Sequence, residues 1–426
     1  MFHRRAVVFL TVIAAALLPA TPGVGAPAEA GGLWSAWLYA DDALSSPPAP
    51  ELARVHQDGR VERFPIPMPA GATLQGTPRA FSADGGRVAL CMRRDDLTSV
   101  RVLDIYGQAD LAYYELGQVS GCDASPDAFN QGNAALLAVG VVNYFPGDPN
   151  RPADDTRPIW ELRVLNLDTG EVEHRLTSDA PAVAALSPYG STEPRAFIPL
   201  VRYFNNDVLV FALVPWGTGG VTDAEAYHWI LGSETVAPVD AYGKTGLDTL
   251  DATGETVWLT LDQSRPSVQP PMPIGPLNVV MYANMAGDRY PIFHQPTSLI
   301  GSTFIDNGRR VAVLIVGAYN PETDSAPTEW VALDRAGAAV KLSAPAERVQ
   351  RLVGAPEGYA FLQLEFLGGD PPLSQAQLYY HRFVDGGTAL ESRLLWEDAS
   401  QPGWDLVWSS EMPAAPGLNP FPALGQ

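Results

Sequence analysis

One stretch decides the predicted fold: Phe81-Ser82-Ala83-Asp84-Gly85-Gly86-Arg87-Val88-Ala89-Leu90. Its Asp-Gly-Gly centre favours a tight turn, because glycine adopts the positive φ that such turns need. The continuously apolar run Val88–Met92 that follows is typical of a strand buried on both faces. The stretch therefore predicts a β-hairpin, Arg79–Met92, whose second strand lies between two neighbouring sheets.

Hairpins of a related form recur along the chain. Seven of them alternate apolar and polar residues around a short polar or glycine-containing turn: Leu52–Pro67, Arg101–Leu116, Leu162–Thr177, Tyr227–Asp240, Asn278–Phe293, Glu329–Ser343 and Gln377–Trp396. Each repeat has room for a second hairpin, as in Ile198–Pro215, Thr303–Val316 and Leu352–Phe366. Four antiparallel strands per repeat predict an all-β fold, a seven-bladed β-propeller, with six or eight blades as the alternatives.

The two ends of the repeat array predict how the ring closes. Only three strands precede the second blade, namely Leu33–Tyr39, Leu52–His56 and Val61–Pro67, so the first blade lacks its innermost strand. Trp404–Ser409 is a single strand left over after the seventh outer hairpin. We expect Trp404–Ser409 to complete the first blade, because this pairing removes two open sheet edges.

The stretch from Phe81 to Leu90 also resembles the repeat signature F-S-P-D-G-x-x-I-A-F of TolB-like, WD40-like β-propellers. Ala83 stands where that signature has proline. Ala124-Ser125-Pro126-Asp127 and Phe304–Ala312 are partial matches. The resemblance covers about ten residues well. It implies the propeller fold and no particular function.

The N-terminus has the layout of a secretory signal peptide. Arg4-Arg5 precedes the apolar run Ala6–Leu18, and small residues suited to cleavage follow up to Ala30. We therefore expect a signal peptide over residues 1–30, a propeller over 31–412 and a proline-rich tail over 413–426. The apolar run is too short for a membrane span, so the predicted location is secreted or extracytoplasmic, in a periplasm or on a cell surface.

The net charge of the chain limits its binding partners. The 48 acidic residues outnumber the 27 basic ones, giving a net charge of −21, which disfavours nucleic acid and anionic lipid as partners.

The two cysteines, Cys91 and Cys122, predict a disulfide in an exported protein, with two buried thiols as the alternative.

Long, acidic, proline-rich loops gather on one face of the predicted propeller, called here the long-loop face. Tyr144, Phe145, Trp216 and Tyr319 lie where buried strands run into these loops, so they are candidate exposed binding residues, with plugging of the blade ends as the alternative. Asp148, Asp154 and Asp155 are candidate Ca²⁺ ligands, although their spacing matches no known calcium loop and solvated surface charge is the alternative. We expect either no cofactor or Ca²⁺.

Enzyme signals are weak. No Gly-x-Ser-x-Gly, His-Glu-x-x-His or phosphate-binding motif occurs, and the histidines of the exported part fall mostly on predicted outer strands. The predicted innermost strands carry a set of charged residues: Arg79, Asp123, Arg202, Asp248, Arg351 and Asp405. Asp123 and Asp248 could act as the two carboxylates of a glycan-cleaving enzyme, whereas pairing with arginine across the channel is the structural alternative.

These observations predict a monomeric extracytoplasmic propeller that uses its long-loop face to hold a protein or glycan partner. A lyase or hydrolase acting on glycans in the central funnel is the alternative.

Overall fold

The computed structural model describes residues 34–40, 50–124, 128–144, 156–186, 197–215, 225–238, 247–250, 256–269, 272–283, 289–295, 298–306, 308–316, 327–334, 336–344, 349–368, 373–384, 389–398 and 403–409. For the described residues between 247 and 302, the structure describes the backbone and not the side chains. Residues Leu33–Gln426 cluster as one compact unit. Within the described ranges, no helix is both long and apolar enough to cross a membrane.

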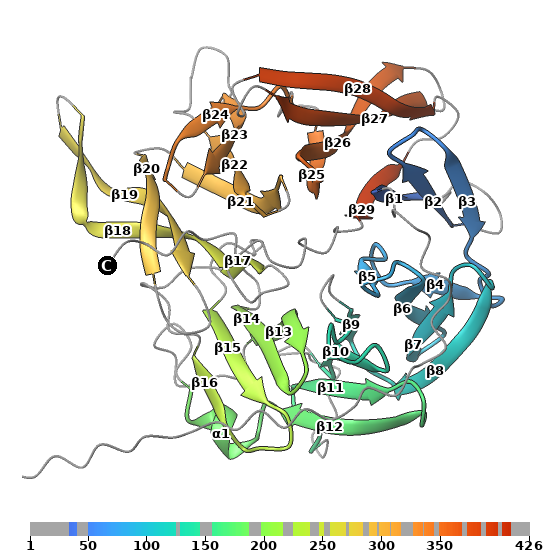
Figure 1. Cartoon of the computed structure of the whole chain (residues 1–426). Coiled ribbons are helices and arrows are strands. Elements are labelled where there is room, and N and C mark those ends of the chain that lie inside the picture. The colour runs from blue at the N-terminus through green and yellow to red at the C-terminus, as the bar shows by residue number, and fades with distance from the viewer. Residues whose placement is uncertain are drawn as a thin grey trace, which may run out of the picture. The chain divides into compact units, whose positions relative to one another are not determined.

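The described strands form seven antiparallel sheets, numbered here in chain order (Figure 1). Sheet 1 contains, in spatial order, β29 (Trp404–Ser409), β1 (Ser35–Ala40), β2 (Glu51–His56) and β3 (Val61–Pro65). Sheet 2 contains β4 (Ala72–Leu74) and β5 (Ala80–Phe81), which both pair with β6 (Arg87–Arg94), then β7 (Leu97–Asp104) and β8 (Ala109–Gly117). Sheet 3 contains β9 (Gly121–Asp123), β10 (Leu136–Val142), β11 (Trp160–Asn166) and β12 (Glu171–Thr177). A one-turn helix, α1 (Pro181–Ala184), follows.

The other four sheets have their strands in chain order. Sheet 4 contains β13 (Phe197–Asn205), β14 (Val208–Pro215), β15 (Glu225–Ile230) and β16 (Val236–Pro238). Sheet 5 contains β17 (Leu247–Leu250), β18 (Thr256–Gln269), β19 (Met272–Ala283) and β20 (Arg289–Gln295). Sheet 6 contains β21 (Ser298–Ile305), β22 (Arg310–Val316), β23 (Thr328–Asp334) and β24 (Ala339–Lys341). Sheet 7 contains β25 (Val349–Ala355), β26 (Gly358–Gly368), β27 (Leu373–Val384) and β28 (Ala389–Asp398).

The predicted all-β architecture of four-stranded antiparallel units is confirmed. The hairpin predicted around Asp84–Gly86 forms between β5 and β6, where Phe81 pairs with Val88 and Gly85 has a φ of +68°. Asp84 stabilises this turn, because its carboxylate accepts hydrogen bonds from Ser82 Oγ and from the Gly86 amide. The local chemistry of the quoted stretch thus fixes the turn that it predicted.

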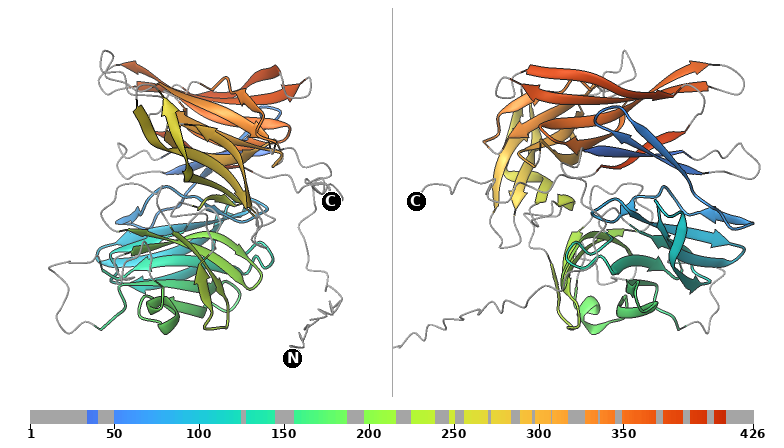
Figure 2. Two further views of the ribbon diagram at one scale, coloured as in Figure 1. Left: turned by 90° about the vertical axis from the view of Figure 1, so that its left-hand side faces the viewer. Right: turned by 45° about the vertical axis from the view of Figure 1, so that its right-hand side comes forward.

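The last strand closes the first sheet, as the sequence predicted. β29 pairs antiparallel with β1, with Leu406 opposite Leu38 and Trp404 opposite Ala40. The red strand β29 lies beside the dark-blue strand β1 in Figure 1 and in the right-hand view of Figure 2. Trp404 and Leu406 are at most 1% exposed, so the pairing also buries apolar side chains.

Apolar clusters lie between consecutive sheets. One joins sheets 7 and 1, and others join sheets 1 and 2, sheets 2 and 3, sheets 3 and 4, and sheets 6 and 7. The second strand of a sheet supplies both neighbouring clusters, which explains why β10 is buried at every residue from Leu136 to Val142. A sheet that buries both faces is stable only when both neighbours are in place.

Glycines allow neighbouring sheets to come close near their inner strands. A Cβ atom at Gly140 of β10 would lie 2.5 Å from the carbonyl oxygen of Pro199 in β13. A Cβ atom at Gly354 of β25 would lie 2.5 Å from the carbonyl oxygen of Phe304 in β21. Any side chain at these two positions would push adjacent sheets apart.

Removing β29 should therefore abolish cooperative folding. A chain ending at Pro402 leaves β1 as an open edge and exposes the cluster between sheets 7 and 1. We expect loss of the near-ultraviolet circular dichroism signal and of a cooperative melting transition. A chain ending at Pro413 is the matched control and should unfold like the full chain. A stable, cooperatively folded chain ending at Pro402 would refute the closure model.

Candidate functional site

The innermost strand of sheet 2 is interrupted, which the sequence did not predict. β4 pairs with the end of β6, through Ala72 opposite Arg94, and β5 pairs with its beginning, through Ala80 opposite Ala89. Residues 75–79 leave the sheet between these two pieces. The only main-chain hydrogen bond that this segment makes to β6 among the described residues runs from the Gln75 amide to the Cys91 carbonyl, at 2.8 Å. Leu90 and Cys91 of β6 thus have no partner residue on an inner strand.

A disulfide bridges the place where the inner strands are short. Cys91 of β6 is bonded to Cys122 of β9, with the two Cα atoms 5.9 Å apart. β9 is itself only three residues long, so little main-chain pairing holds it to β10. The bond links sheets 2 and 3 across 31 residues of sequence.

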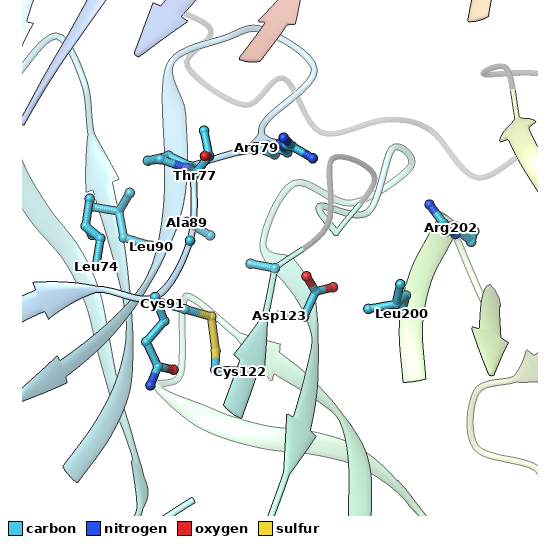
Figure 3. Close-up of a pocket in the computed structure, with 14 residues that line it drawn as sticks. Leu74, Thr77, Arg79, Ala89, Leu90, Cys91, Cys122, Asp123, Leu200 and Arg202 are labelled. Carbon is cyan, nitrogen blue, oxygen red and sulfur yellow. A yellow bond between two sulfur atoms is a disulfide. The ribbon is translucent and has the colours of Figure 1, made fainter. Parts of the chain in front are cut away.

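A cavity of about 350 Å³ lies at this place. Segment 74–79, residues 89–91 of β6, residues 122–124, and Leu200 and Arg202 of β13 line it. It therefore touches the inner parts of sheets 2, 3 and 4. Figure 3 shows Asp123 and Arg202 extending from neighbouring strands toward the same space, with the disulfide at one side.

Two residues that line the cavity each have a polar atom without a hydrogen-bond partner among the described residues. The Nε atom of Arg202 and the Oε1 atom of Gln75 are both buried, and neither has a hydrogen-bond partner among the described residues. A buried donor or acceptor that stays unsatisfied destabilises a protein by about 1–3 kcal/mol. Arg202 lies at a register shift between Val201 and Tyr203, where a bulge changes the direction of a side chain. Gln75 and Arg202 are thus lining residues of the cavity that each keep one buried polar atom unsatisfied by the described residues.

Arg79, at the same cavity, has a partner on the closing strand. Its guanidinium lies 3.6 Å from the Asp405 carboxylate of β29, so the predicted pairing between charged residues of the innermost strands occurs here. Arg351 of β25 likewise donates a hydrogen bond to the Leu406 carbonyl, at 3.3 Å. Of the two arginines that line the cavity, Arg79 therefore has a partner, whereas the buried Nε atom of Arg202 has none among the described residues.

The predicted catalytic carboxylates lie on separate inner strands. Asp123 lines the cavity from β9 of sheet 3. Asp248 lies on β17 of sheet 5, at a register shift between Leu247 and Thr249, and its side chain is outside the description. Sheet 4 comes between these two sheets in the chain order.

Of the four predicted binding aromatics, only Tyr144 lies in the described part of the chain. Tyr144 is 4% exposed, and the guanidinium of Arg157 lies 4.9 Å from its ring centroid. The expected exposed position of Tyr144 is therefore wrong, because the ring packs at the end of sheet 3. Phe145, Trp216 and Tyr319 lie outside the described residues, as do the candidate calcium ligands Asp148, Asp154 and Asp155. No group of three potential metal ligands occurs in the part of the chain that the structure describes.

A buried carboxylate supports the base of the loop that carries those aspartates. Glu161 of β11 is 1% exposed and accepts two hydrogen bonds of 2.7 Å from Arg175 and one of 2.9 Å from Arg163. Asn143 donates to the same carboxylate and also to the Pro158 carbonyl, both at 2.8 Å. Burial opposes ionisation of Glu161, but these donors outweigh it and lower its pKa from 4.5 to about 2.

The sequence contained a signal for part of the missed geometry. Gly76 and Pro78 lie within the interruption of the inner strand, Gly71 directly precedes β4, and both glycines have positive φ. Such residues indicate a break in a strand. The sequence gives no signal that Gln75 Oε1 and Arg202 Nε lack hydrogen-bond partners among the described residues, because this depends on atoms from three sheets.

Comparisons with known proteins concern the fold. No family model matches the sequence, and no curated protein matches it. A prolyl endopeptidase structure is 14% identical, with a TM-score of 0.52 over 84% of this chain and 47% of that chain. Oligogalacturonate lyase from Vibrio parahaemolyticus is 12% identical, with a TM-score of 0.50 over 80% of this chain and 86% of that chain. The chain thus has the fold of a β-propeller and spans about half the length of the peptidase.

TolB is also among the matching structures. TolB from Acinetobacter baumannii is 14% identical, with a TM-score of 0.38 over 74% of this chain and 64% of that chain. At these identities the likeness is one of fold, and function has to be argued from the residues of this chain.

Loss of the disulfide should destabilise the protein. The double substitution Cys91→Ser and Cys122→Ser should lower the free energy of unfolding by about 3–4 kcal/mol, from the chain-entropy estimate for a loop of this size. Denaturant unfolding at neutral pH measures the effect. A reductant should shift the wild type toward the double variant and leave the variant unchanged. Equal stability of wild type and variant would refute a supporting role for the bond.

The Glu161 cluster should make stability depend on acid. Because the folded pKa lies below the ordinary one, Glu161 stabilises the protein above pH 4.5 and loses this effect as the pH falls toward 2. Glu161→Gln should cost about 3 kcal/mol at neutral pH, and the difference from wild type should shrink in acid. Glu391→Gln, at a carboxylate that is 65% exposed, is the control. A difference that does not change with pH would contradict this prediction.

Proposed function

We propose that this chain is an extracytoplasmic binding propeller that holds a protein or glycan partner. The observation that carries the proposal is the cavity between sheets 2, 3 and 4, which is lined by Arg202, a residue whose Nε atom has no partner among the described residues. Its volume of about 350 Å³ lies in the range of small-ligand pockets, so it suits one residue or terminal group of a larger partner. In this proposal the long-loop face contacts the rest of the partner.

The chemistry of the cavity favours a ligand group that carries a carboxylate. A guanidinium N–H donates its strongest hydrogen bonds to anionic oxygens. Gln75 Oε1 would at the same time accept a hydrogen bond from a hydroxyl or amide of the ligand. Because the whole chain carries a net charge of −21, an acidic partner would be held at this local site and not by general attraction.

Arg202→Met tests the binding hypothesis. We expect the mature protein to bind members of an immobilised panel of acidic and neutral oligosaccharides and peptides, with preference for those that carry a carboxylate. The substitution should weaken that binding about tenfold or more, because it removes a hydrogen bond to a charged group. Arg309→Met, at an exposed arginine of sheet 6, is the matched control.

Two results would overturn the proposal. One is equal binding by wild type and Arg202→Met, and the other is preference for the neutral members of the panel. Repeating the measurement with EDTA tests the separate proposal that Asp148, Asp154 and Asp155 hold Ca²⁺, since chelation would then lower binding without any change at Arg202.

A glycan-cleaving enzyme is the second candidate, because Asp123 reaches the same cavity as Arg202. Incubation with the oligosaccharide panel, followed by product analysis, tests it. Cleavage that is lost in both Asp123→Asn and Asp248→Asn would replace the binding-only proposal. Binding without cleavage would leave Asp123 as a ligand-contacting residue.

A further inference from the structure

A second cavity, of about 290 Å³, lies on sheet 7, away from the residues of the inner cavity. Its lining comes from β26, β27 and β28 and from Ser343, which follows β24 of sheet 6. Sheet 6 covers the inner part of this face of sheet 7 through one shared apolar cluster. The outer strand β24 has only three residues, whereas β27 has twelve and β28 has ten. The described strands of sheet 6 therefore do not cover the outer part of the face.

The register of sheet 7 places two rows of side chains on this face. Tyr359, His381 and Ser392 lie directly opposite one another on β26, β27 and β28. Phe361 and Tyr379 form the next row, with their rings stacked at 5.4 Å between centroids. The cavity thus has hydrogen-bonding groups along one row and aromatic rings along the other.

The first row forms a continuous hydrogen-bonded line. The Ser343 amide donates to the Tyr359 hydroxyl, at 3.2 Å. That hydroxyl lies 3.2 Å from His381 Nδ1, and His381 Nε2 lies 3.0 Å from Ser392 Oγ. Because the buried Tyr359 hydroxyl needs an acceptor for its own proton, it donates to Nδ1, which leaves the imidazole proton on Nε2. Nε2 then donates to Ser392 Oγ, so the Ser392 hydroxyl hydrogen can reach a ligand.

This arrangement does not activate Ser392 as a nucleophile. A general base would have to accept the serine proton at Nε2, and that nitrogen already carries a proton in the assigned arrangement. Burial also lowers the pKa of His381 to about 4, so the ring is neutral at neutral pH. The row therefore suits binding and orientation of a ligand and does not suit covalent chemistry.

The described lining of this cavity carries no charge at neutral pH. Ser343, Gln363 and Ser392 offer hydroxyl and amide groups, and Phe361, Tyr379 and Leu390 offer apolar surface. An ionic ligand would lose its hydration here without gaining a charged partner, which disfavours it. A purely aromatic ligand would leave the polar row unpaired, which disfavours it as well. A sugar ring satisfies both rows, because it has an apolar face and a rim of hydroxyl groups.

We propose that this cavity binds one neutral pyranose residue, with its apolar face against the ring of Tyr379 and its hydroxyl groups on Ser392 and Gln363. The volume of about 290 Å³ suits a single sugar ring and no larger unit. The proposal does not depend on the inner cavity, which would take an acidic group.

Methyl glycosides of glucose, galactose, mannose and N-acetylglucosamine are the probes, measured on the mature protein by saturation-transfer NMR and calorimetry. We expect at least one to bind in the millimolar range, as befits a single small contact surface. Tyr379→Ala should abolish binding, and Tyr379→Phe should retain most of it because the ring stays in place. Ser392→Ala should weaken binding about tenfold through the lost hydrogen bond.

Two matched variants serve as controls. Tyr113→Ala removes a tyrosine of β8 that is 57% exposed, and Leu111→Ala removes an apolar side chain of the same strand that is 45% exposed. Both should bind the glycoside like wild type, and melting temperatures show that each variant is folded. If Tyr379→Ala does not fold, Ser392→Ala and Gln363→Ala decide, since the Ser392 side chain is exposed and Gln363 is only half-buried.

Three results would overturn the proposal. One is that none of the four glycosides binds. The second is that binding is unchanged in Tyr379→Ala and Ser392→Ala. The third is that p-cresol binds at this site and the glycosides do not, which would make the cavity a site for aromatic compounds.

Discussion

The pairing of β29 with β1 is the contact on which the rest of the structure depends. Each of the well-described sheets buries apolar side chains against its neighbours, and one cluster lies between the last sheet and the first. That cluster exists only if the two ends of the chain come together, and β29 supplies the strand that holds them. Polar contacts reinforce this junction: Arg63 of β3 binds Asp398 of β28 at 2.6 Å, and Ser409 binds the Gly354 carbonyl at 3.0 Å.

The inner cavity lies where the innermost strands of two sheets do not extend along the full length of their neighbours. The inner strands of sheets 2 and 3 are interrupted or short, so the backbone does not fill the space beside Cys91, and a disulfide holds the two sheets together there. Glu161 and Arg202 illustrate the difference between a charged group with partners and one with an unsatisfied atom. Glu161 is surrounded by donors and stabilises the fold, whereas Arg202 has a buried donor that no described residue satisfies.

The two cavities differ in chemistry although they belong to one fold. The inner one contains arginines and a carboxylate, and the one on sheet 7 is lined by uncharged polar groups and aromatic rings. Peptidases and a lyase share the fold with this chain at no more than 14% identity. A common fold with such different activities does not indicate a function, which has to be argued from the side chains of this chain.

The sequence by itself determined the strands, their turns and the closing strand. These features depend on local chemistry, as in the Asp84–Gly86 turn and the apolar run after it, and on the count of strands at the two ends. The sequence also placed Asp123 and Arg202 on inner strands, because a continuously apolar run marks the buried second strand and the inner strand precedes it.

Only the tertiary structure decided which of these residues form a site. The inner cavity needs atoms from three sheets, and the row Tyr359, His381 and Ser392 depends on the register of β26, β27 and β28. Tyr144 illustrates the same limit, because a tyrosine at the end of a strand is exposed or buried according to its neighbours, here Arg157. Such contacts join residues that are far apart in the chain, and no local pattern encodes the distance between them.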